Sequence, residues 1–172
     1  MTTEKLNTKE LFTSLDNAFA ELLTMIEALN EPLLNAIPFA GSWTASQLVV
    51  HVTKSNLSIV QALDMEARKT ERDADERARE LKEIFLDFTI KFQSPDFIVP
   101  AEGPYEKETV IAKLYRSMER LKEQRMKADL FEILSLPAFG EITKLELLYF
   151  VLYHTQRHTH QLKNIIRVIT KK

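Results

Sequence analysis

The residues of this 172-residue chain with the clearest potential to bind a metal or to take part in catalysis are its four histidines. Three of the four, His154, His158 and His160, fall within one short stretch, and the fourth is His51. His154 and His158 are four residues apart, so inside a helix their rings lie on one face, about 5.4 Å apart along the axis. That face also carries Leu147, Val151, Leu162, Ile165 and Ile169. It is therefore expected to be buried, and two neutral imidazoles there are either hydrogen-bonded core residues or two thirds of a metal site.

His51 is placed to join that pair if its own helix faces theirs. Thr44 followed by Gln47 is a capping-box pattern, which predicts that a helix starts two turns before His51. The face around His51 carries small and polar residues, which indicates a cavity beside the ring. Three buried histidines meeting in one bundle would be satisfied together by a divalent cation; otherwise each ring bonds a carbonyl or a hydroxyl.

Four amphipathic helices are predicted to position these histidines. Hydrophobic residues recur at three- and four-residue steps over about residues 9–30, from Thr44 onward, over 107–127 and over 143–169. Thr143 followed by Glu146 repeats the capping box at the start of the last helix.

The connection between the second and third helices is the longest in the chain. From residue 66 to residue 83 the charges alternate in sign, and pairs such as Asp73 with Arg77 have helical spacing, which predicts a solvated helical face. Prolines and a glycine then break the pattern, and irregular stretches of this kind often border binding sites. Residues 137–140 form a further turn, and no strand-like alternation is apparent. We therefore expect an all-α, single-domain four-helix bundle over residues 1–172, with a longer crossover between helices 2 and 3.

Charge and composition narrow the class of partner. The formal net charge is −2 and the isoelectric point is near 6.1, so no overall cationic field is available for nucleic acid or anionic lipid. The chain has no cysteine, so any thiol chemistry needs a thiol from outside. No apolar run approaches the ~18 residues that span a bilayer. We expect a soluble, cytoplasmic protein with no nucleic-acid or membrane partner.

Other catalytic motifs are absent from the sequence. Thr155 stands where a His-Glu-x-x-His zinc protease has its glutamate, and there is neither a glycine-rich phosphate loop nor a Gly-x-Ser-x-Gly elbow. Gln161, three residues after His158, either orients that ring or lies on the bundle surface. Trp43 either lines a pocket or packs at the start of the second helix. No acidic residue shares the histidine faces within one turn, so the sequence shows no general base.

Two motifs carry a resemblance to a known family. They are Pro-Phe-x-Gly-Ser-Trp-Thr-x-x-Gln-Leu-x-x-His over residues 38–51 and His-Thr-Gln-Arg-His-x-x-Gln-Leu over residues 154–162. With the first motif near the N-terminus and the second near the C-terminus, the chain closely resembles the DinB/YfiT-like superfamily, and the likeness spans essentially its whole length. It implies a bundle of up-down-down-up type, often dimeric, with a divalent metal held by His51, His154 and His158. His160 matches no ligand position, and it lies about 200° around the helix from His158, so it is expected to face away.

The chemistry of such a site follows from its ligands. Three neutral imidazoles without a carboxylate leave the metal its full charge and an open position, so a thiol or water bound there would lose a proton near neutral pH. Imidazole suits zinc, nickel and iron, of which zinc and nickel are the expected ions.

Three functions remain open at this point. Characterised relatives in the family include S-transferases that use low-molecular-weight thiols such as bacillithiol or mycothiol. The resemblance therefore implies a metal-dependent enzyme that transfers a small thiol to an electrophile; the alternatives are a metal-dependent hydrolase and a noncatalytic metal or small-molecule binding bundle. The absence of an evident acidic base favours thiol transfer, and a homodimer is a state that the resemblance allows.

Alanine at either His154 or His158 is expected to remove the metal while leaving the chain helical, because burial of the hydrophobic stripes stabilises the bundle. Metal content and circular dichroism, measured on the same sample, test this. His160→Ala is the matched control and should keep its metal. Loss of helix together with metal would show that the site is structural.

Overall fold

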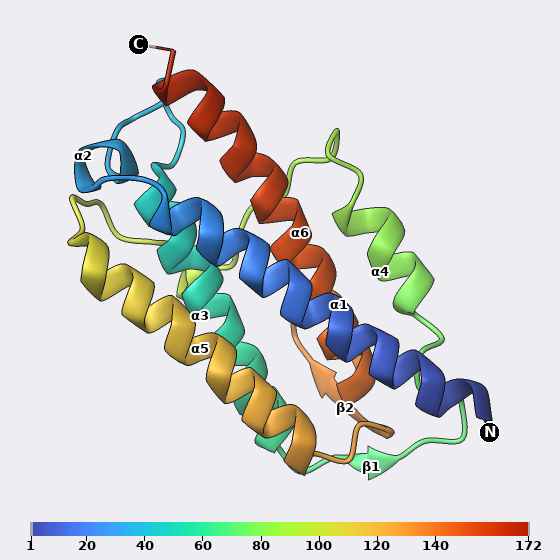
Figure 1. Ribbon diagram of the computed structural model, residues 1–172. Coiled ribbons are helices and arrows are strands. Elements are labelled where there is room, and N and C mark those ends of the chain that lie inside the picture. Colours follow the sequence, from blue (N-terminus) through green and yellow to red (C-terminus); the bar gives the residue numbers. More distant parts are fainter. Residues whose placement is uncertain (1, 172) are drawn as a thin grey trace.

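Four long helices form a bundle in this computed structural model, which describes residues 2–171 (Figure 1). They are α1 (Thr2–Glu27), α3 (Ala45–Asp64), α5 (Lys107–Lys127) and α6 (Lys144–Ile169). Helices α1 and α6 run toward the end of the bundle that carries the short helix α2 (Glu31–Leu34), whereas α3 and α5 start at that end. The directions are therefore up, down, down and up, and the predicted four-helix bundle is confirmed.

The core lies where the hydrophobic stripes of the four helices meet. Helix α3 packs between α5 and α6, and α1 closes the bundle against the same two helices. The largest fully buried side chains of these helices are Leu15, Leu22, Ile26, Leu48, Leu63, Leu114, Met118, Leu147, Leu148 and Leu162. Burial of each such side chain stabilises the fold by about 1.5–3 kcal/mol. The four helices therefore share one continuous apolar core.

Both helices that carry the histidines start at their predicted caps. The Thr44 hydroxyl accepts a bond from Gln47 N at 3.2 Å, and the Gln47 side chain accepts one from Thr44 N at 3.0 Å. Thr143 and Glu146 make the same reciprocal pair at 3.0 and 2.9 Å. Because a cap fixes the first helical residue, it also fixes how far along each helix the histidines lie.

The prediction of a solvated helix over residues 66–83 is confirmed for residues 78–83 and wrong for residues 66–77. The chain instead forms a two-residue strand, β1 (Arg68–Lys69), then turns, and only then the helix α4 (Ala78–Phe85). Arg77 pairs with Glu80 and not with Asp73. The helical spacing of the charges was misleading because exposed i,i+4 ion pairs stabilise a helix only weakly. The buried carboxylate of Glu146 binds Arg72 and the backbone of Arg77, and these stronger bonds favour a non-helical chain there.

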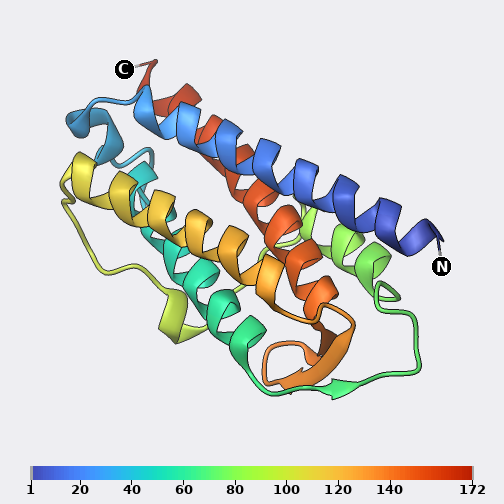
Figure 2. The same cartoon turned by 60° about the horizontal axis from the view of Figure 1, so that its bottom comes forward.

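The structure also contains a small three-stranded sheet that the sequence did not predict. Strands β2 (Glu132–Leu136) and β3 (Gly140–Thr143) form a hairpin around the predicted turn, and β1 pairs antiparallel with β2. Figure 2 shows this sheet at the end of the bundle where α3 and α5 end and α6 begins. Its strands have only two to five residues each, too few for alternation to be read from sequence. Gly140, with φ of 68°, supplies the left-handed turn residue.

The rest of the crossover is irregular, as predicted. It runs from the end of α4 to the start of α5 and contains one short 3₁₀ helix, η1 (Asp96–Ile98). In the described part of the chain, no helix combines the length and the apolar character needed to cross a bilayer.

Glu146 ties the crossover to the start of α6. Its carboxylate is fully buried and accepts bonds from both terminal nitrogens of Arg72, at 2.7 and 2.8 Å, and from the backbone N–H groups of Arg77 and Thr143, at 2.8 and 2.9 Å. Burial alone would raise the pKa of Glu146, but these bonds together outweigh it and hold the pKa below its ordinary value. The ionised carboxylate is therefore part of the folded state.

Glu146→Ala is expected to lower the free energy of unfolding by about 3–5 kcal/mol, because it leaves the partly buried Arg72 with only exposed Glu76, 3.8 Å away, and removes the acceptor of the Arg77 and Thr143 N–H groups. The matched control Glu83→Ala removes an exposed pair with Arg79 and should cost less than about 1 kcal/mol. The pKa of Glu146 is lower in the folded than in the unfolded state. Its contribution to the free energy of unfolding is therefore complete above the ordinary pKa of 4.5 and is lost as the pH falls through the folded-state pKa. Urea unfolding at several pH values should therefore show the difference from wild type narrowing in acid; a difference no larger than the control's would contradict this account.

Candidate metal centre

Helices α3 and α6 bring three histidine rings to one point inside the bundle. The Nε2 atoms of His51 and His154 are 3.2 Å apart, those of His51 and His158 are 3.0 Å apart, and those of His154 and His158 are 3.1 Å apart. The exposed fractions of the three residues are only 2%, 6% and 7%. The structure therefore places together the three histidines that the family resemblance implied.

The outer nitrogens of two rings fix which tautomer each adopts. His51 Nδ1 lies 2.9 Å from the carbonyl oxygen of Ile98, and His158 Nδ1 lies 2.9 Å from Oε1 of Gln161. A carbonyl oxygen only accepts, so both Nδ1 atoms must donate. Each of these neutral rings then has a bare lone pair at Nε2, and the two lone pairs face each other at 3.0 Å. His154 can donate a proton to one of them but not to both.

Burial keeps the imidazoles neutral. It lowers the pKa of His158 to about 3, helped by the charge that His51 would carry and opposed by the bond to Gln161. Burial and the neighbouring histidines hold the pKa of His154 well below its ordinary value. Burial also lowers the pKa of His51, against the bond to Ile98. Neutral imidazole is the form that binds metals, so protons do not compete for these nitrogens near neutral pH.

The geometry fits a divalent cation. Bonds of about 2.0–2.1 Å from a metal to imidazole nitrogens, at angles between 90° and tetrahedral, separate those nitrogens by about 2.9–3.4 Å. The observed separations of 3.0–3.2 Å lie in this range. A cation at the centre would also satisfy the facing lone pairs. Among the described residues, no carboxylate oxygen joins the group, so a metal held there would keep its full charge.

Aromatic rings enclose the cluster on two sides. The Trp43 ring centroid is 4.9 Å from that of His51, and those of Phe150 and Phe85 are 5.0 and 6.3 Å from that of His154. Trp43 therefore lies against the cluster, and its packing at the start of α3 stays a prediction. Phe85 and Ile98 come from the crossover and were missed, because no local pattern links them to helices far away in sequence.

Three further residues near the cluster bear on the sequence expectations. Gln161 contacts His158 Nδ1 and so orients that ring, as one reading proposed. His160 is exposed and stacks on Phe88, with 3.9 Å between the ring centroids, so the expectation that it faces away is confirmed. Arg157 lies beside the cluster, but it bonds the crossover rather than the histidines.

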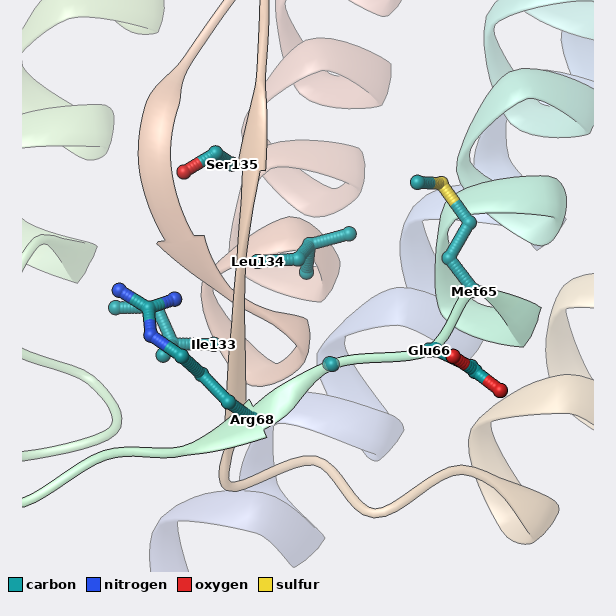
Figure 3. A pocket seen from close by; sticks show the side chains of 7 residues that line it. Met65, Glu66, Arg68, Ile133, Leu134 and Ser135 are labelled. Atoms are coloured by element: carbon teal, nitrogen blue, oxygen red, sulfur yellow. The ribbon is translucent and has the colours of Figure 1, made fainter.

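A separate surface pocket lies at the other end of α3. It has a volume of about 330 Å³ and is lined by Met65, Glu66, Ala67, Arg68, Ile133, Leu134 and Ser135 (Figure 3). The pocket is lined by no histidine and by a single carboxylate, that of Glu66. It therefore does not compete with the histidine cluster as a metal site.

The family model of the DinB superfamily matches residues 14–162, a stretch that includes all three clustered histidines. The chain belongs to the DinB superfamily. A curated relative, the uncharacterized protein YuaE of Bacillus subtilis (strain 168), is 27% identical over 163 residues, which cover 87% of this chain and 93% of YuaE.

Two solved structures share the fold. One is TT2238, described as a four-helix bundle protein, with a TM-score of 0.61 and 23% identity over 91% of this chain and 98% of that one. The other is YfiT from Bacillus subtilis, described as a probable metal-dependent hydrolase with an unusual four-helix bundle topology. It has a TM-score of 0.57 and 18% identity over 92% of this chain and 85% of YfiT. At these identities the likeness establishes the fold.

Gln161→Ala is expected to weaken metal binding by about 10–100-fold, because His158 loses the partner that fixes its tautomer and ring orientation. Trp43 is the only tryptophan, and its contact with His51 makes quenching of its fluorescence by Ni²⁺ a direct measure of binding. Gln156→Ala, at an exposed position of the same helix, is the matched control and should bind as wild type does. Equal affinities for the two variants would show that Gln161 has no orienting role.

Proposed function

We propose that this protein is a metal-dependent enzyme that transfers a low-molecular-weight thiol to an electrophilic substrate, with zinc or nickel held by His51, His154 and His158. The observation that carries the proposal is the convergence of three neutral, buried imidazoles with no carboxylate among them. A cation so held supplies Lewis-acid chemistry, lowering the pKa of a thiol that binds to it. The chain itself has no cysteine, so the thiol is a substrate.

The chain's own residues would hold and shield the reacting groups. Ile98 and Gln161 keep two of the rings in the tautomer that presents Nε2 to the centre. Trp43, Phe85 and Phe150 exclude water around the rings, which strengthens electrostatic interactions inside the site. Among the described residues no carboxylate lies in the cluster, so the proposed reaction uses no carboxylate base there.

Hydrolysis is the second candidate. It is favoured by the likeness to YfiT, the fold neighbour described as a probable metal-dependent hydrolase, and the same Lewis-acid chemistry would activate water. Hydrolysis commonly uses a general base beside the activated water, and the cluster supplies no carboxylate for that role. A thiol ionises more readily than water and needs less help, which is why we place thiol transfer first.

A panel of small thiols, assayed with a chlorinated aromatic compound and a Michael acceptor, tests the proposal. With zinc or nickel present, His51→Ala should slow transfer by at least about a hundredfold, because the Lewis acid that it loses would lower the barrier by several kcal/mol. His160→Ala is the matched control and should retain the wild-type rate. Identical rates for wild type and His51→Ala with every thiol would overturn thiol transfer. Ester and amide substrates, tested on the same proteins, would then decide between hydrolysis and binding without catalysis.

A further inference from the structure

The histidine cluster is too well covered for a substrate to reach it directly. With exposed fractions of 7% or less, the rings admit a small molecule only if something beside them moves. Outside α3 and α6, the ring contacts and hydrogen bonds that reach the cluster come from Trp43, Phe85 and Ile98. Trp43 directly precedes the Thr44 cap and is fixed by it. Phe85 and Ile98 belong to the crossover, which is therefore the part that must open.

The crossover has little core of its own. Between residues 86 and 101 only Ile98 and Pro100 are buried, while five large apolar side chains are exposed. These are Phe88, Ile90, Phe92, Phe97 and Val99. Segments with few buried apolar contacts open at the lowest free-energy cost. The segment leads from α4, which packs on α6, past α3 to the start of α5 (Figure 2).

One side chain of α6 holds the first part of this segment in place. Arg157 Nη1 donates to the carbonyl oxygens of Phe85 and Asp87 at 3.2 and 3.0 Å, and Nη2 donates to that of Ile90. The guanidinium also lies over the Phe92 ring, 4.7 Å from its centroid. Within the described residues, Arg157 has no carboxylate at ion-pair distance, so its contacts all serve to bind the crossover.

The second part of the segment is held from α3. Lys54 Nζ donates to the carbonyl oxygen of Val99 at 3.0 Å, and Gln47 Nε2 donates to that of Ala101 at 3.4 Å. Each of these residues makes a single hydrogen bond to the crossover, whereas Arg157 makes three. Arg157 is therefore the strongest side-chain tether of the segment.

We propose that Arg157 is a positioning residue that keeps residues 85–92 closed over the histidine cluster, so that release of its bonds opens the route by which small molecules reach the rings. Its place in α6, one residue before His158 and three after His154, sets the cover directly against the site. The planar guanidinium reaches three carbonyls through two nitrogens and also stacks on Phe92, which the compact ammonium of lysine does not reproduce. The inference concerns access to the site of the proposed function, but it depends on neither metal nor activity.

Acylation of the histidines by diethyl pyrocarbonate, located by peptide mapping in the full chain after treatment with a chelator, tests this. Arg157→Ala should speed modification of His154 and His158 at least about tenfold, since loss of even one charge-assisted bond from the closed state is worth that factor. Arg157→Lys should be intermediate. His160 stacks on Phe88 of the opening segment, so its modification should also speed up, whereas Arg167→Ala, at an exposed position of the same helix, should behave as wild type.

Hydrogen exchange on the untreated chain is the second measurement. The amides of residues 86–92 should exchange faster in Arg157→Ala, while those of α1 keep their protection. The proposal is overturned if His154 and His158 react at the wild-type rate in both Arg157→Ala and Arg157→Gln, or if buried Tyr153 and the α1 amides speed up equally, which marks general destabilisation. If removing metal unfolds the chain, the exchange experiment decides. Because neither measurement involves catalysis, failure of the thiol-transfer assay would leave this result unaffected.

Discussion

The Nε2 lone pairs of His51 and His158 face each other at 3.0 Å inside the protein core, and this repulsive contact is the main physical constraint on the site. Water cannot relieve their repulsion because the rings are buried, and protonation is disfavoured because burial lowers their pKa. A divalent cation relieves it while using all three nitrogens. The bonds from His51 to Ile98 and from His158 to Gln161 create this situation, since each forces the lone pair inward. The groups around the ligands are therefore as much a part of the site as the ligands.

The depth of the site depends on where two helices begin. Thr44 starts α3 and Thr143 starts α6, and each does so through a reciprocal bond with the residue three positions on. For α6 that residue is Glu146, whose carboxylate also binds Arg72 of the crossover. One buried carboxylate thus sets the start of the helix that supplies two histidines and anchors the connection that supplies the cover. An ion pair outside the site contributes to the geometry inside it.

The helices of the bundle and the connections between them contribute different parts of the site. The helices provide the three histidines that could hold a metal, and such residues need rigid placement. The crossover provides Phe85, which covers His154, and the Ile98 carbonyl, which orients His51. Members of a superfamily can keep such a scaffold while the connections around it vary, and for this reason fold likeness to TT2238 and YfiT does not assign a reaction. The chemistry of this chain depends on its own three clustered histidines and on the residues around them.

The sequence by itself determined the helices and the candidate ligands. Capping boxes at Thr44 and Thr143 and hydrophobic stripes at helical spacing are local signals, set by bonds and contacts within a few residues. The spacing of His154 and His158 is local in the same sense. What only the tertiary structure decided is non-local: the approach of His51 to that pair, the bond from Ile98, and the capture of Arg72 by Glu146 in a segment whose charges had suggested a helix. Such contacts join residues tens of positions apart, and their energies exceed the weak local preferences because burial removes competing water.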